Sequence, residues 1–94
     1  MTSKERAFLR KNANGLDAIF QVGKDGIASE LAEGVGKALK ARELIKLRVL
    51  ETAPVTAREA AEELAEKLNA EVVQVVGGRF VLYKKNKDIN AYGV

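Results

Sequence analysis

The residues whose types and spacing could bind a ligand are Gly23-Lys24-Asp25-Gly26. They lie between a β-like run that ends at Val22 and a helical pattern that begins near Ile27. Glycine lacks a Cβ and tolerates positive φ, so two glycines around a lysine allow the backbone to approach a polyanion closely. A helix that starts just beyond the loop would add free N–H groups and the positive end of its dipole. These residue types at this spacing predict a phosphate-holding loop built from Gly23, Lys24 and Gly26. The alternative is a plain strand-to-helix turn with an exposed lysine.

The chain lacks the residues that most catalytic mechanisms need. The 94 residues include no Cys and no His, which excludes thiolate and imidazole nucleophiles, histidine acid–base catalysis and zinc-ribbon sites. Neither a Walker A string nor G-x-G-x-x-G is present. The candidate acids fall on the solvent side of a predicted helix, where carboxylates are usually just solvated: Glu59, Glu62, Glu63 and Glu66. We therefore expect no enzymatic activity, no cofactor and no metal site.

The net charge of +3 conceals a segregation of charge along the chain. Residues 1–50 carry ten Lys/Arg and six Asp/Glu, residues 51–71 carry two and six, and residues 72–94 carry four and one. One acidic segment therefore separates two basic ones. Such segregation predicts a polyanionic partner.

Length and apolar content predict one domain. With 47% hydrophobic residues, 94 residues can form a modest core and leave no room for a second domain. No apolar run approaches the length of a signal sequence or a membrane span, so we expect a cytoplasmic protein. We assign residues 1–85 to the domain, and residues 86–94, which show no apolar period, to a flexible C-terminal tail.

Hydrophobic periodicity predicts the elements that position the loop. Helices are expected from Thr2 or Ser3 to about Asn14, over about 29–41, and from the capping box at 56–59 to Asn69. Strands are expected over 18–22, 44–50, 71–76 and 79–83, with Gly77-Gly78 forming a two-residue hairpin between the last two. The order α-β-α-β-α-β-β predicts a two-layer α+β fold with a mixed four-stranded sheet. In this sheet the first three strands are parallel neighbours and the last hairpin is antiparallel.

A second set of cations lies on and before the second strand. Ile45, Leu47 and Val49 share one face of this strand, and Lys46 and Arg48 share the other. Helices on both faces would make these charged positions awkward, so an exposed basic stripe is the simpler outcome; the alternative is the ordinary wet side of a half-covered strand. The stretch from Lys37 to Arg48 holds five cations and one Glu, the others being Lys40 and Arg42. Lys37 and Lys40 also suit the C-terminal end of a helix dipole.

Three segments together, residues 21–26, 38–49 and 75–84, resemble the landmark segments of the CRM domain, the chloroplast RNA splicing and ribosome maturation domain. The resemblance covers about residues 3–85 and is to the stand-alone bacterial, YhbY-like type. The family's glycine loop maps onto residues 23–26, and its basic strand segment maps onto Arg42, Lys46 and Arg48. Its final glycine and basic residue map onto Gly78 and Arg79. The departures are slight: Gly77 is an extra glycine, and the second helix contains Gly34 and Gly36.

The resemblance implies an RNA-binding domain similar in topology to the C-terminal domain of translation initiation factor three. It also implies ribosomal RNA in precursors of the large ribosomal subunit as the partner, and a role in ribosome biogenesis. The chain has only two Tyr and three Phe, which favours recognition of phosphates and RNA shape over base stacking. We expect a monomer whose RNA-contacting residues are Gly23, Lys24, Gly26, Lys37, Lys40, Arg42, Lys46, Arg48, Gly78, Arg79 and Lys84. The alternative is a protein–protein interaction module that docks a basic ribosomal protein through the acidic third helix.

Overall fold

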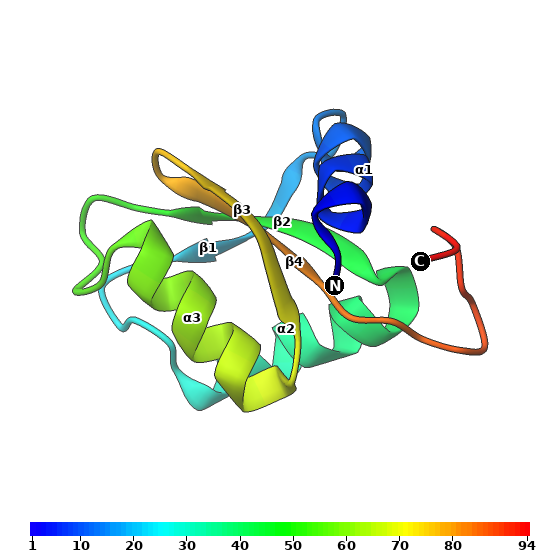
Figure 1. Cartoon of the computed structure of the whole chain (residues 1–94). Helices are drawn as coiled ribbons and strands as arrows, with labels where there is room; N and C mark the ends of the chain where they lie inside the picture. Colours follow the sequence, from blue (N-terminus) through cyan, green and yellow to red (C-terminus); the bar gives the residue numbers. More distant parts are fainter.

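The computed structural model describes all residues from Met1 to Val94 and contains three helices and one four-stranded sheet (Figure 1). The elements follow the predicted order: α1 (Ser3–Ala13), β1 (Ala18–Val22), α2 (Ser29–Arg42), β2 (Leu44–Val49), α3 (Ala57–Leu68), β3 (Glu71–Val76) and β4 (Arg79–Tyr83). The predicted α+β fold class with a mixed four-stranded sheet is confirmed. None of the helices combines the length and the apolar character needed to cross a membrane.

Two of the helices begin at a threonine capping box. The hydroxyl of Thr2 accepts a hydrogen bond from the Glu5 N–H (3.1 Å), and the Glu5 carboxylate accepts one from the Thr2 N–H (2.9 Å). The same reciprocal pair joins Thr56 and Glu59 at the start of α3. The hydrogen bonds from Thr2, above all the one from its backbone, lower the pKa of Glu5. These caps fix where α1 and α3 begin, because they satisfy N–H groups that have no partner inside the helix.

The strand order is β1-β2-β4-β3, with β1 and β2 parallel and the other two pairs antiparallel. The prediction that the second and third strands are neighbours is wrong, because β4 lies between them. In β4 every residue from Phe80 to Tyr83 is buried, whereas β3 is mostly half-buried or exposed. A strand covered on both faces belongs in the middle of a sheet, and the partly exposed strand takes the edge.

The main core lies between the sheet and the pair α2 and α3 (Figure 1). The helix α3 contributes a stripe of small residues, of which Ala60 and Ala61 are fully buried. The sheet contributes mainly large side chains, including Ile45, Leu47 and Phe80. Small side chains on the helix facing large ones on the sheet let the two layers approach closely.

The helix α1 covers part of the opposite face of the sheet, which we call the outer face (Figure 1). It buries Leu9 and Ala13 against four sheet residues: Leu44, Val73, Val81 and Tyr83. The Arg6 guanidinium donates a hydrogen bond to the Val72 carbonyl and lies 4.0 Å from the Glu71 carboxylate, which ties α1 to β3. The fold therefore has a partial third layer in addition to the two that were predicted, because α1 covers part of the outer face.

The C-terminal segment 86–94 lies against the domain through Glu43 and Tyr83. The fully buried carboxylate of Glu43 accepts hydrogen bonds from the N–H groups of Asn86 (2.9 Å) and Ala91 (2.6 Å). The ring of Tyr92 meets the ring of Tyr83 edge-on, with centroids 6.4 Å apart. The flexibility expected from the sequence stays a prediction, because these contacts give a position and not a mobility. Apolar periodicity could not predict these contacts of the C-terminal segment, since they depend on one carboxylate and one aromatic ring.

Candidate nucleic-acid interface

The part of the outer face that α1 leaves uncovered carries a row of exposed residues across all four strands, and three of the four residues are polar. Gln21 of β1 pairs with Arg48 of β2, Arg48 pairs with Arg79 of β4, and Arg79 pairs with Val76 of β3. Directly paired residues point to the same face with Cβ atoms about 5 Å apart. All four of these residues are exposed. We call them the arginine row.

The two arginines of this row have no counter-charge. The four ion pairs of the protein involve Arg6, Lys37, Arg58 and Lys67, and all of them lie outside the arginine row. Like charges directly opposite each other destabilise a strand pair. An anion placed between the two guanidinium groups would relieve this repulsion and could accept hydrogen bonds from both, as phosphate oxygens do.

Lys46 extends the basic surface towards α1. It is half-buried and lies one pleat back from Arg48 on the same face, where it pairs with Val81. Together with Arg79 it lines a hollow whose other polar residues are Asn14, at the end of α1, and Gln74 of β3. No sequence signal indicated Gln21, Asn14 and Gln74, because neutral amides carry no charge. Strand pairing places Gln21 and Gln74 on this face, and the position of α1 on the sheet brings Asn14 to it.

The glycine loop lies at the same end of the sheet as the arginine row. The parallel strands β1 and β2 both end there, and the β3–β4 hairpin turns there. Lys24 is exposed at the tip of the loop, and α2 follows with an N-cap, Ala28, that offers no side-chain hydrogen bond. The structure therefore brings Lys24 to the end of the sheet that carries Arg48 and Arg79. That the loop holds phosphate stays a prediction.

Gly26 also has a packing reason to be glycine. Its φ is +62°, its N–H donates to the Gly23 carbonyl (3.0 Å), and it is buried. A Cβ at this position would lie 3.3 Å from Cγ of Pro54. Both the backbone conformation and the close neighbour exclude a larger residue without strain. Gly26 thus shapes the turn, whichever ligand the loop contacts.

The hairpin glycines divide their tasks. Gly77 has the positive φ (+56°) that the turn needs, whereas Gly78 does not. The Gly78 carbonyl accepts a hydrogen bond from the Val49 N–H (2.6 Å), and a Cβ on Gly78 would lie 3.2 Å from the Val49 carbonyl oxygen. Gly78 is therefore required by the close approach of the hairpin to β2, which also seats Arg79 beside Arg48.

The remaining predicted residues lie away from the arginine row. Lys37 on α2 is exposed and paired with Glu33 (3.4 Å), one turn earlier. Arg42 is exposed and lines a hollow near the start of β2, where Lys46 and Asp17 also lie. Lys40 and Lys84 line another hollow at the C-terminal end of α2. The predicted set is thus not one surface but is distributed over both ends of the sheet.

The acidic residues of α3 have local partners. Glu59 belongs to the capping box, Glu62 lies 4.0 Å from Arg58, and Glu63 lies 3.7 Å from Lys67. These contacts stabilise the helix, and this role explains most of the acidic residues of α3 without a partner protein. They do not favour the alternative of an acidic docking helix.

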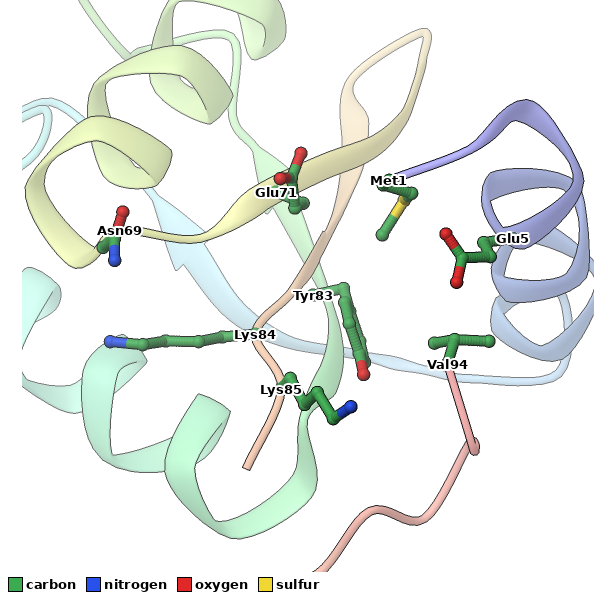
Figure 2. Close-up of a pocket in the computed structure, with 8 residues that line it drawn as sticks. All are labelled: Met1, Glu5, Asn69, Glu71, Tyr83, Lys84, Lys85 and Val94. Atoms are coloured by element: carbon green, nitrogen blue, oxygen red, sulfur yellow. The ribbon is translucent and has the colours of Figure 1, made fainter. Parts of the chain in front are cut away.

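A pocket at the other end of the outer face mixes both signs of charge (Figure 2). Glu5 and Glu71 line it together with Lys84 and Lys85, and Tyr83 forms part of its wall. The Tyr83 hydroxyl is buried and makes no hydrogen bond. Burial, and secondly the nearby carboxylate of Glu43, raise the pKa of this phenol. Carboxylates beside the lysines make this pocket a poor site for a polyanion.

Comparison with known proteins places the chain in a family. The model of the CRS1/YhbY (CRM) domain matches residues 1–84. The Bacillus subtilis protein named "Probable RNA-binding protein YqeI" is 40% identical over 88 residues, covering 94% of this chain and 92% of that protein. The Methanocaldococcus jannaschii protein named "Probable RNA-binding protein MJ0652" is 36% identical over 94 residues, covering 98% of this chain and 69% of that protein.

A solved structure supports the same relationship. The solution structure of the hypothetical protein SAV1595 from Staphylococcus aureus superimposes with a TM-score of 0.79 at 39% sequence identity. The match covers 93% of this chain and 91% of that one. Sequence and fold therefore agree over nearly the whole chain.

Proposed function

This chain belongs to the CRS1/YhbY (CRM) domain family, and we propose that it is an RNA-binding protein that contacts phosphates through the arginine row. The names of its B. subtilis and M. jannaschii relatives support RNA as the partner. We propose further that the RNA is ribosomal RNA in precursors of the large ribosomal subunit, and that the protein assists ribosome assembly as a monomer. We propose that the protein binds this RNA in the cytoplasm.

The observation that carries the proposal is the direct pairing of Arg48 and Arg79 on adjacent strands, without a carboxylate within 4.0 Å of either. This arrangement costs stability in the free protein. It is explained if an anionic partner occupies the space between the guanidinium groups. Lys46 adds charge on the same face of the sheet, and Lys24 adds charge at the same end, so both extend the basic surface available to backbone phosphates.

The proposed mode of recognition is contact with phosphates and RNA shape. No aromatic residue belongs to the arginine row, and the aromatic side chain that the outer face does hold, Tyr83, is buried. A sheet that stacks bases needs exposed aromatic side chains. Competition between RNAs of equal secondary structure and scrambled sequence tests this mode. A base change that abolishes binding while the RNA fold persists would contradict it.

The test of RNA binding is a titration of a structured fragment of large-subunit ribosomal RNA at several salt concentrations. Lys/Arg contacts to phosphates release counterions, so the logarithm of the affinity should fall linearly with the logarithm of the salt concentration. A flat plot would refute the electrostatic account. Co-sedimentation with ribosomal particles, followed by sequencing of crosslinked RNA, tests the proposed ribosomal target separately.

A further inference from the structure

A hollow at the C-terminal end of α2 has lysines in its wall and no carboxylate. Lys40 comes from α2, whereas Lys84 and Lys87 come from the segment after β4. Lys85 also belongs to the wall, but Figure 2 shows its side chain and that of Lys84 pointing to opposite sides of the segment that follows β4. None of these lysines has a carboxylate within 4.0 Å. We call Lys40, Lys84 and Lys87 the lysine hollow.

Helix stability explains only part of this cluster. The Lys84 ammonium donates a hydrogen bond to the Leu68 carbonyl (2.8 Å) at the C-terminal end of α3, and Lys40 lies in the last turn of α2. Cations are favourable at both of these places. Lys87 belongs to neither helix, so the favourable interaction of a cation with a helix end does not explain its position beside Lys40.

The segment that carries Lys87 is held by Glu43. This carboxylate is fully buried, has no cation within 4.0 Å, and bonds to the N–H groups of Asn86 and Ala91, on either side of Lys87. The Asn86 side chain also donates to the Lys40 carbonyl (2.6 Å). Releasing the segment would break both of these hydrogen bonds to Glu43, which is unfavourable. Glu43 therefore acts as a positioning residue that keeps Lys87 next to Lys40.

We infer that the lysine hollow is a second RNA-contacting surface, which binds backbone phosphates separately from the arginine row. This inference rests on the proposed function, since it assumes that the partner is RNA. The residues from Arg79 to Lys84 span the length of β4, so the two surfaces lie about 17 Å apart at the rise of a strand. They also differ in side, because Lys84 reaches the end of α3 whereas Arg79 lies on the outer face. The RNA in contact with the protein thus extends around one edge of the domain or contributes two segments.

The test is the double variant Lys40→Glu with Lys87→Glu, titrated with the same ribosomal RNA fragment at several salt concentrations. The matched control is Arg58→Glu with Lys67→Glu, which makes the same change in net charge on α3. We expect the lysine variant to bind at least about tenfold more weakly than the control, with a salt slope reduced by roughly two contacts. An affinity and slope equal to those of the control would overturn the inference. If the unmodified protein itself does not bind the RNA, the proposed function fails first, so the two failures are distinguishable.

The positioning role of Glu43 is tested with Glu43→Gln. We expect faster hydrogen exchange at the Asn86 and Ala91 amides and a partial loss of RNA affinity, although every lysine remains. Unchanged exchange and unchanged affinity would show that the carboxylate does not hold the segment. Because Glu43 is buried and its carboxylate accepts two backbone hydrogen bonds, this variant could fail to fold. The surface lysine variant then still decides whether the hollow contacts RNA.

Discussion

Arg48 on β2 and Arg79 on β4 are directly paired residues of two antiparallel strands, although they lie far apart in the sequence. Both are exposed, and neither is neutralised by a carboxylate. Val49 follows Arg48 in the chain, and Gly78 precedes Arg79. The hydrogen bond between Val49 and Gly78 fixes the register that brings the two arginines together. At this point of the sheet, stability of the free protein and attraction for an anion oppose each other.

The first prediction uses this opposition. Arg79→Glu should form a cross-strand ion pair with Arg48 and raise the free energy of unfolding by about 0.5 kcal/mol. The same change should weaken RNA binding at least about tenfold, because a charge-assisted hydrogen bond is worth about 1.5–3 kcal/mol. Urea denaturation and RNA titration measure the two effects. Lys67→Glu, with the same change in net charge on α3, should leave binding nearly unchanged. A stabilised variant that keeps full RNA affinity would remove the arginine row from the interface.

The second prediction concerns Lys24. Lys24→Glu should weaken RNA binding and reduce the salt slope, because it replaces an attractive charge with a repulsive one. The melting temperature should change little, since the side chain is exposed. Glu63→Lys on α3 is the comparison, and there binding should stay the same or improve. If both variants keep the affinity and slope of the parent protein, the glycine loop is a structural turn only.

The third prediction separates backbone geometry from ligand binding. Gly26→Ala should lower the free energy of unfolding by about 1–2 kcal/mol, because Gly26 has a φ of +62° and the new Cβ would meet Pro54 at 3.3 Å. Gly15→Ala is the control, since nothing lies within 4 Å of a Cβ at that position. Its effect should stay within about 0.5 kcal/mol. Equal stability of the two variants in urea would contradict the packing role of Gly26.

The fourth prediction concerns Tyr83 and pH. Burial and Glu43 raise the pKa of this phenol above its ordinary value of 10.0, so the folded protein retains the proton at a pH where the unfolded chain releases it. The associated stability is complete below about pH 10 and is lost as the pH rises through the raised pKa. Tyr83→Phe should remove this part of the pH dependence. At neutral pH it should be neutral or stabilising by up to about 1 kcal/mol, because the buried hydroxyl makes no hydrogen bond.

These effects can be measured by urea denaturation of both proteins below and above pH 10. Ultraviolet absorbance of phenolate then shows whether the late-titrating tyrosine is lost in the variant. A variant whose stability falls with pH exactly as the parent's does would contradict the assignment to Tyr83. A strong loss of stability at neutral pH would show that the hydroxyl has a partner.

Local signals were sufficient for the elements and for the glycine loop. The capping box at Thr56, the helical period of α3 and the alternation in β2 each depend on neighbours within a few residues, so these elements could be predicted from the sequence. The loop between β1 and α2 is local in the same sense, and its lysine is exposed as expected. The resemblance carried by three segments of the chain indicated the CRM family, which the family model matches over residues 1–84.

The sequence by itself thus determined the elements, the fold class, the family and the basic character of the chain. Only the tertiary structure decided that β4 lies between β2 and β3, that Arg48 faces Arg79, and that Glu43 holds the segment around Lys87. The physical reason is the range of the interactions. Helix caps and periodicity are settled between residues close in sequence, whereas strand order and a buried carboxylate depend on which distant segments remove each other from water. That the predicted cations contact RNA stays a prediction, whereas their division into two surfaces follows only from the folded chain.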